Sequence, residues 1–433
     1  MTIVIDYGHI KGGSMAKVSI IGGYNTKFGA FIKKDKETGV ITDTKSIYEL
    51  MVEALRGAVE DSGLDPAEID AIWVGSFAPG LFTEQDHLGP YALEAFPDAW
   101  RFKPTQRVEG ACASSSMAVL NAIYGIESGR YKVAVIVGVE KMNLLKTADV
   151  THALAGASFW PSEGGQGMTF PGLFAEYAKG YQKRYGFSDD QLRRMLATAA
   201  ALNYTNAMEN PLAHFGAGSP AEKYGLFTAD AILNLPEEKN PIVAAPLHLH
   251  DCSLVSDGAA ALVIAADDIA KAKKSGVVEF AGIGHTSERL AIKDRQNMYE
   301  LIAAKRAVKA AMAEAGIESK DLQAAEVHDC FTINQLLCTE ALGLSEDGKS
   351  GYDYMEGRFG KSDVCPVNLS GGLKAKGHPV GATGASMHVL MYKQMTGNPI
   401  GAARSRGVPE WGATLNVGGS AATNAVSILR RVR

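Results

Sequence analysis

Two stretches far apart in the chain share one pattern of apolar and polar positions. They read YELMVEALRGAVEDSGLDPAEIDAIWVGSF (48–77) and YELIAAKRAVKAAMAEAGIESKDLQAAEVHDCF (299–331). Each predicts an amphipathic helix that ends at a glycine, Gly63 or Gly316, and is followed by a short strand. Because the spacing from the glycine to the strand is the same in both, the pattern indicates a duplicated unit.

A second pair of helices follows the same duplication. Residues 114–129 (SSSMAVLNAIYGIESG) align with residues 382–397 (ATGASMHVLMYKQMTG), and both helices begin after small residues and end at a glycine. On this register Cys112 lies opposite Val380, and His378 lies two residues before that point. The two halves are therefore predicted to place a cysteine and a histidine at nearly equivalent helix entrances.

The intervening segments predict buried strands, and strands that alternate with helices indicate an α/β fold. Residues 143–245 interrupt this alternation and are interpreted as an inserted loop domain. The predicted division is a first half at 15–142, its return after the insertion at 246–275, and a second half at 276–433. Residues 1–14 are set aside as a leader or an expression scar.

Composition narrows the class of protein. The chain has 433 residues, of which 46% are hydrophobic, and its formal charge is −5, so no basic surface argues for nucleic acid. No apolar run reaches the ~18 residues of a membrane span. The five cysteines match neither a disulfide scaffold nor a metal-binding spacing, which favours free thiols in the reducing cytoplasm.

Cys112 is the first candidate for chemistry. It lies in VEGACASSSM, where small neighbours let a substrate carbonyl approach, at the entrance of a predicted helix. Free N–H groups at such an entrance stabilise a thiolate, so we expect an anionic sulfur. A lone cysteine is more often a buried apolar residue, and position alone does not decide between the two interpretations.

The glycine-rich stretch NLSGGLKAKGHPVGATGAS (368–386) favours the catalytic interpretation. It holds His378 between a glycine and a proline, an irregular setting that suits a presented base more than a core residue. A nucleophilic cysteine requires such a base. The alternative is a histidine that merely caps the following helix.

Two further stretches end predicted strands with polar residues. EVHDCFTINQ (326–335) places His328, Asp329 and Cys330 at a strand end, where α/β folds usually bind ligands. A metal site is the weaker hypothesis there, because no second cluster has ligand spacing. LNVGGSAATN (415–424) offers the N–H groups of Gly418 and Gly419 to an oxyanion, although a plain turn would use the same residues.

Taken together, these stretches resemble the thiolase superfamily over nearly the whole chain, from about residue 17 onward. The motifs GACASSS, SDGAAALVIA and GGLKAKGHPVGATG occur in the order typical of that family. The resemblance implies a five-layered α-β-α-β-α fold of two duplicated halves with an inserted loop domain. It also implies reversible acyl transfer on coenzyme A thioesters, which are substrates, with no tightly bound cofactor and no metal, and a homodimer or tetramer.

The resemblance also assigns roles to residues. Cys112 matches the acylated nucleophile and His378 its base, while Gly418 matches the glycine that completes an oxyanion hole with the N–H of Cys112. The usual Asn-Glu-Ala-Phe motif reads HDCF here, so His328 takes the asparagine position and is expected to form a second oxyanion hole with His378. Cys330 is expected to replace the usual second catalytic cysteine.

Two residues are expected on the substrate side of the site. Asn416 occupies the position of the missing second cysteine, and Ser253 matches a serine near the pantetheine arm of coenzyme A. This exchange is similar to the sterol-carrier-protein type of thiolase and to archaeal and bacterial acetoacetyl-CoA thiolases.

The function expected from this resemblance is Claisen condensation or thiolysis of a 3-ketoacyl-CoA such as acetoacetyl-CoA. One alternative is a thiolase-like acyltransferase that acts on a non-CoA acceptor within a multi-protein complex. Another is a catalytically silent protein that binds acyl-CoA or lipid. Expected partners are a small OB-fold protein or a synthase that consumes acetoacetyl-CoA.

Overall fold

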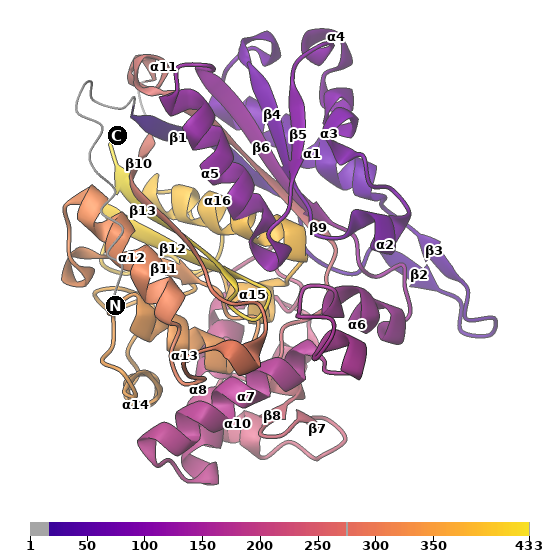
Figure 1. Ribbon diagram of the computed structural model, residues 1–433, viewed down its shortest axis with the longest axis vertical. Helices are drawn as coiled ribbons and strands as arrows, with labels where there is room; N and C mark the ends of the chain where they lie inside the picture. Colours follow the sequence, from indigo (N-terminus) through magenta and orange to yellow (C-terminus); the bar gives the residue numbers. More distant parts are fainter. Residues whose placement is uncertain (1–16, 274–275, 433) are drawn as a thin grey trace.

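The computed structural model describes residues 17–273 and 276–432. The predicted leader at 1–14 lies outside these residues. Nine strands form one sheet in the order β11-β12-β13-β10-β1-β9-β6-β4-β5 (Figure 1). These strands are β1 (Val18–Asn25), β4 (Ala71–Gly75), β5 (Thr105–Val108), β6 (Val133–Glu140), β9 (Gly258–Ala266), β10 (Val278–Ser287), β11 (Ala324–Val327), β12 (Trp411–Gly418) and β13 (Thr423–Arg431).

The strand order shows the duplication. β1 and β10 join the two halves through only two residue pairs, and the halves extend from this seam in opposite directions. In the first half β4 pairs in parallel with β5, and in the second half Ala325 of β11 forms a parallel bridge with Val367. The repeat predicted from the sequence is therefore present at the level of strand pairing.

Four long helices complete a five-layered arrangement (Figure 1). α1 (Ile47–Ser62) covers the outer face of the first half, and α12 (Ile302–Ala315) covers the outer face of the second. α5 (Ser114–Glu127) and α16 (Thr383–Met395) pack against each other between the two halves of the sheet. This architecture confirms the predicted α/β fold and its five layers.

The ends of α1 and α12 follow the sequence signals. Ser46 and Glu49 form a capping box at the start of α1, which satisfies free N–H groups of its first turn. Gly63 and Gly316 end the two helices with φ angles of 69° and 70°, a left-handed conformation that favours glycine. The predicted helix ends are thus confirmed.

Residues 143–245 contribute no strand to the large sheet and contain mainly helices. The division of the chain into domains at this segment stays a prediction. The helices of the segment are α6 (Thr147–Ala155), α7 (Phe170–Tyr185), α8 (Asp189–Ala207), α9 (Pro220–Lys223) and α10 (Ala229–Leu233). At the end of the segment, the strand β7 (Ile242–Ala244) pairs with β8 (Leu247–His248), which lies just beyond it.

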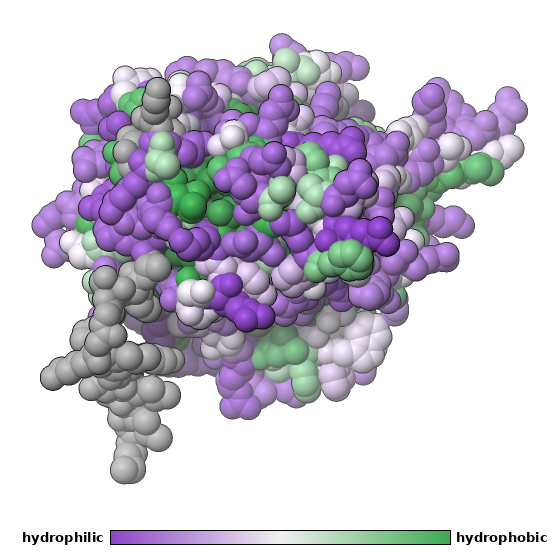
Figure 2. Space-filling model, turned by 90° about the horizontal axis from the view of Figure 1, so that it is seen from above, coloured by the Kyte–Doolittle hydropathy of each residue, from purple (hydrophilic) through white to green (hydrophobic). Residues whose placement is uncertain are grey.

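Smaller elements surround this framework. The hairpin β2 (Ile32–Lys34) and β3 (Ile41–Asp43) projects from the side of the molecule (Figures 1 and 2). Figure 2 shows that the face beside it is mostly hydrophilic. The short helices are α2 (Pro79–Thr83), α3 (Leu88–Tyr91), α4 (Pro97–Trp100), α11 (Asp267–Ala272), α13 (Thr332–Ala341), α14 (Ser350–Met355) and α15 (Gly372–Lys376).

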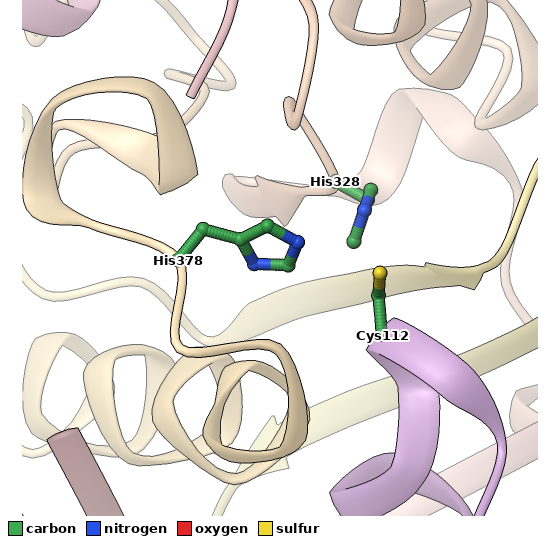
Figure 3. A group of neighbouring side chains, drawn as sticks. All are labelled: Cys112, His328 and His378. Atoms are coloured by element: carbon green, nitrogen blue, oxygen red, sulfur yellow. The ribbon is translucent and has the colours of Figure 1, made fainter. Parts of the chain in front are cut away.

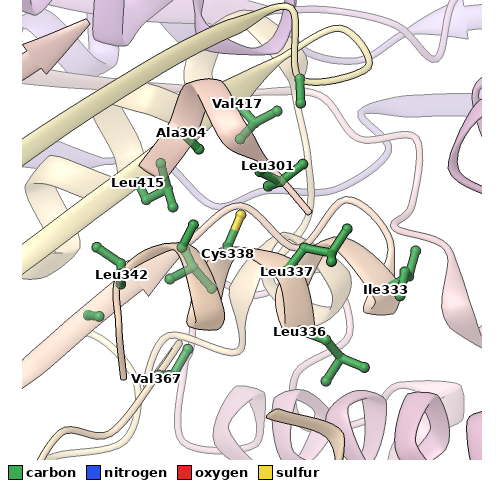
Figure 4. Packing of buried hydrophobic residues seen from close by; sticks show 14 of the residues in the cluster. Leu301, Ala304, Ile333, Leu336, Leu337, Cys338, Leu342, Val367, Leu415 and Val417 are labelled. Carbon is green, nitrogen blue, oxygen red and sulfur yellow. The ribbon is translucent and has the colours of Figure 1, made fainter. Parts of the chain in front are cut away.

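The helix α13 anchors the HDCF turn in the core. Its residues Leu336 and Leu337 are buried in a cluster with Leu415 and Val417 of β12 and with residues of α12 (Figure 4). The turn that carries His328 and Cys330 is therefore fixed by packing on both of its ends. Among the described residues, no helix is both long enough and apolar enough to cross a membrane.

Candidate active site

Cys112 lies in a single 3-10 turn (Ala111–Ala113) that leads directly into α5. The side chain of Ser114 ties this turn together, because it accepts from the N–H of Gly110 at 3.0 Å and donates to the carbonyl of Ala111 at 2.6 Å. Ala111 has a φ of 51°, a left-handed conformation that is strained for a residue with a Cβ. The local structure therefore holds Cys112 in one presented conformation.

His378 lies in the loop between α15 and a second 3-10 turn (Val380–Ala382) that leads into α16. Its Nδ1 is 2.7 Å from the hydroxyl oxygen of Thr383, and that hydroxyl donates to the carbonyl of Pro379 at 3.0 Å. A hydroxyl has one hydrogen to donate, so Thr383 accepts from Nδ1–H of His378. Nε2 is then left with a lone pair, as a base requires.

His328 and Cys330 follow the end of β11, as the sequence predicts. The backbone of His328 is held on both sides, by the carbonyl of Leu415 at 3.0 Å and by the amide of Asn334 at 2.6 Å. The carbonyl of Cys330 accepts from the N–H of Ser253 at 2.8 Å. The HDCF turn and the Ser253 segment are thus linked directly.

The structure brings Cys112, His328 and His378 together (Figure 3). One ligand-type atom of each, a sulfur or a ring nitrogen, lies within 4.8 Å of the others. The two histidine rings have centroids 5.2 Å apart and are nearly perpendicular, at 85°. The sulfur of Cys112 points toward His328, with the ring of His378 beside both (Figure 3).

Within the described residues, the ligand-type atoms of these three side chains are also close enough together to hold a metal ion. A metal would need a lone pair on the free Nε2 of His328. Nδ1 of that ring, however, lies 2.8 Å from the amide nitrogen of Asn416, a hydrogen-bond donor, which leaves the ring hydrogen on Nε2. The group is therefore better suited to bind a developing negative charge than a metal.

A cavity of about 180 Å³ reaches Cys112 and His378 of this group. Cys112, His378, Cys330 and Ser253 line it, and most of the remaining wall is apolar. The apolar residues of the wall include Phe77, Met142, Leu154, Phe170, Leu254 and Val380. A mostly apolar cavity that ends in a few polar groups suits an acyl chain with a reactive carbonyl.

Two residues differ from their expected places. Gly419, rather than Gly418, lines the cavity, and a backbone hydrogen bond from Gly419 reaches the thiol of Cys112. Asn416 is fully buried behind His328 and does not line the cavity, since its amide is used by His328 and Ser116. The family resemblance predicts Asn416 on the substrate side, because Asn416 occupies the position of the missing second cysteine.

The expectation of an anionic Cys112 is wrong for the resting protein. Burial raises the pKa of its thiol to about 12, and this effect outweighs the hydrogen bond from Gly419. Burial lowers the pKa of His378 to about 3, with Lys376 contributing in the same direction. The resting pair is therefore a neutral thiol beside a neutral imidazole, which can take the proton when the sulfur attacks.

This pairing predicts how alkylation of Cys112 depends on pH. The thiolate is the species that reacts with iodoacetamide, so the rate should keep increasing above pH ~9 instead of levelling off near neutrality. The measurement is the alkylation rate of the peptide that contains Cys112, followed by mass spectrometry between pH ~6 and ~10, with a small free thiol as reference. A plateau below pH ~7 would indicate a preformed ion pair and contradict the neutral pair.

Two buried carboxyl groups position the histidine loop, a role that is not predicted from the sequence. Asp329 accepts from the N–H groups of Leu373 at 2.7 Å and Lys374 at 3.0 Å, which fixes the start of α15. Glu140 accepts from the N–H groups of Phe77 at 2.8 Å and Gly381 at 3.0 Å, which joins the two halves just after His378. Burial raises the pKa of each carboxyl to about 7. The sequence signal for this role is an acidic residue at or just after the end of an apolar strand.

Comparison with known proteins agrees with this geometry. The family model "Thiolase, N-terminal domain" matches residues 18–268, and "Thiolase C-terminal domain-like" matches residues 284–431. An "Acetyl-CoA acetyltransferase" of Methanothermobacter thermautotrophicus is 36% identical over 417 residues, which cover 96% of this chain and 100% of the relative.

Two solved structures share the fold. An "Ltp2-ChsH2(DUF35) aldolase" has a TM-score of 0.76 at 20% identity. The match covers 97% of this chain and 99% of the chain in that structure. Human mitochondrial 3-ketoacyl-CoA thiolase in complex with CoA has a TM-score of 0.67 at 16% identity, with 97% and 99% covered. From the two matched domains and the full-length relative we conclude that this chain belongs to the thiolase family.

Proposed function

We propose that the protein is an acetyl-CoA C-acetyltransferase, a thiolase that makes and cleaves acetoacetyl-CoA through an acyl group on Cys112. The observation that carries the proposal is that Cys112, His378 and His328 meet beside a cavity that Cys112, His378 and Cys330 line. The full-length similarity to an acetyl-CoA acetyltransferase supports the same reaction. Coenzyme A thioesters are the substrates.

In the direction of thiolysis, the sulfur of Cys112 attacks the keto carbon of acetoacetyl-CoA while Nε2 of His378 takes the thiol proton. The bond between the α-carbon and the keto carbon breaks, and its electron pair forms the enolate of acetyl-CoA. Cys330 then protonates the α-carbon. Burial raises the pKa of Cys330 well above its ordinary value, so its resting form is the acid that this step needs.

The enolate oxygen needs hydrogen-bond donors at the moment it forms. Nε2–H of His328 is buried and has no protein partner, so it is free to donate to that oxygen. His378 becomes a second donor while it holds the proton from Cys112. The acyl oxygen on Cys112 is held by the backbone N–H groups of Cys112 and of Gly419, which lines the cavity.

The second half of the cycle restores every proton. The thiol of free coenzyme A gives its proton to the Cys330 thiolate and attacks the acyl carbon. The sulfur of Cys112 leaves and regains its proton from His378. The sum is one acetoacetyl-CoA and one coenzyme A converted to two acetyl-CoA, and condensation follows the same steps in reverse.

A multi-protein acyltransferase remains the second candidate, because the structural neighbour Ltp2-ChsH2(DUF35) aldolase is named with a second component. We propose that the chain forms a homodimer or tetramer and that a small OB-fold protein or an acetoacetyl-CoA-consuming synthase is its partner. All five cysteines are free thiols, which supports a reducing location such as the cytoplasm.

Thiolysis of acetoacetyl-CoA by free coenzyme A tests this function. The purified chain should convert the substrate to acetyl-CoA without any added protein, and the rate should follow ping-pong kinetics because an acyl-enzyme forms. Cleavage only after a partner is added would favour the multi-protein acyltransferase. Binding of acetoacetyl-CoA without cleavage would favour a silent binding protein.

A further inference from the structure

The ring of His328 uses its two nitrogens differently. Nδ1 lies 2.8 Å from the amide nitrogen of Asn416, whereas Nε2 is buried without a protein partner. An amide nitrogen only donates, so Nδ1 accepts and the ring hydrogen is on Nε2. Which nitrogen of His328 carries hydrogen thus depends on how the amide of Asn416 is turned.

A serine on the middle helix turns that amide. The hydroxyl of Ser116, on α5, lies 2.8 Å from the oxygen of the Asn416 side chain, and both residues are buried. A buried hydroxyl needs an acceptor for its hydrogen, and the amide oxygen supplies it. If the amide were reversed, the hydroxyl hydrogen of Ser116 would lose this acceptor. The hydrogen bonds therefore run in one direction, from Ser116 to Asn416 and from Asn416 to His328.

His378 has the opposite arrangement. Its Nδ1–H donates to Thr383, which leaves a lone pair on Nε2. The ring centroids of the two histidines are 5.2 Å apart, and different neighbours hold one ring as a donor and the other as a base. If the tautomers were not fixed, either histidine could present a lone pair or a hydrogen, and the site would lack a defined donor and a defined base.

We propose that Asn416 is a positioning residue that, oriented by Ser116, holds His328 in the tautomer with hydrogen on Nε2. This tautomer supplies the donor for the enolate oxygen. The inference rests on the proposed thiolase function for its role in catalysis, but the tautomer itself does not depend on that function.

Substitution Asn416→Asp tests the proposal, because a carboxylate has nearly the same shape as the amide but only accepts. The carboxylate would accept from Nδ1–H and raise the pKa of His328. Below that pKa the imidazolium still donates from Nε2, but above it the lone pair of Nε2 faces the enolate oxygen. We expect kcat/KM for thiolysis to decrease roughly 10²–10³-fold as pH rises through the new pKa, with little change in the KM for acetoacetyl-CoA.

The matched control is Asn424→Asp. Asn424 is buried in the neighbouring strand β13, and its amide donates to the carbonyl of Ala421 instead of a histidine. This control should show no new decrease in kcat/KM with pH. If Asn416→Asp has the same pH profile as the wild type, or if both variants gain the same profile, the proposal is overturned.

NMR of protein with ¹⁵N-labelled histidine measures the tautomer without any assay of activity. The two ring nitrogens of a neutral histidine have different ¹⁵N shifts, and the His328 signals are assigned by their loss in His328→Asn. We expect Nε2–H for His328 in the wild type and a mixture of tautomers in Ser116→Ala. Nδ1–H in the wild type would overturn the proposal even if thiolysis is confirmed. Nε2–H in a protein without thiolase activity would leave the tautomer standing and reject the proposed function.

Discussion

Substitution Cys112→Ala should abolish thiolysis of acetoacetyl-CoA, with a loss of at least about 10⁴-fold in kcat. The proposed reaction passes through an acyl group on this sulfur, and no other thiol in the described residues has both the position and the base. Cys330 lines the same cavity. However, the hydrogen bond from Nδ1–H of His378 to Thr383 leaves Nε2 of His378 free, and His378 forms its close group with Cys112.

The measurement is steady-state thiolysis together with thermal unfolding of the variant. Alanine removes only a sulfur atom on the wall of the cavity and leaves the packing of the core intact, so the melting temperature should change little. Activity within about tenfold of the wild type would mean that the acyl group is not carried by Cys112 and would reject the mechanism.

Substitution Cys330→Ala should reduce thiolysis by about 10²–10⁴-fold and leave only trace activity, because it removes the acid that protonates the α-carbon. The variant should nevertheless still accept an acetyl group on Cys112 from acetyl-CoA, since the nucleophile and its base remain. This separation of the two half-reactions distinguishes loss of an acid/base from general damage to the site.

Cys365→Ala is the matched control. Cys365 is a buried cysteine of the same hydrophobic cluster as Cys330, but it does not line the cavity. This control should keep near-normal turnover. Near-normal rates in Cys330→Ala as well would show that the acid/base assignment is wrong.

The sequence predicts the framework of the protein because local signals suffice there. Gly63 and Gly316 end two helices in the left-handed conformation that a glycine allows, and the shared spacing after them reveals the repeat. The same repeat placed Cys112 and His378 at two helix entrances. Because α5 and α16 pack together in the middle layer, these entrances meet in the structure.

The charge state of the site could not be predicted in the same way. The helix entrance suggests a low pKa for Cys112. Cys112 instead packs against an apolar cluster that includes Phe82, Met142 and Val380, all distant in sequence, and burial raises its pKa to about 12. The direction in which the side chain of Asn416 points could not be predicted from the sequence either. Whether a residue of a strand faces a cavity or a neighbouring side chain depends on packing, and the amide of Asn416 contacts Ser116 and His328, each far away in the sequence.

The most direct test of the central claim is mass spectrometry of the protein after brief mixing with acetyl-CoA. We expect one acetyl group on the peptide that contains Cys112, both in the wild type and in Cys330→Ala, and its release when free coenzyme A is added. An acetyl group on another residue, or turnover without any acetylated protein, would contradict the account.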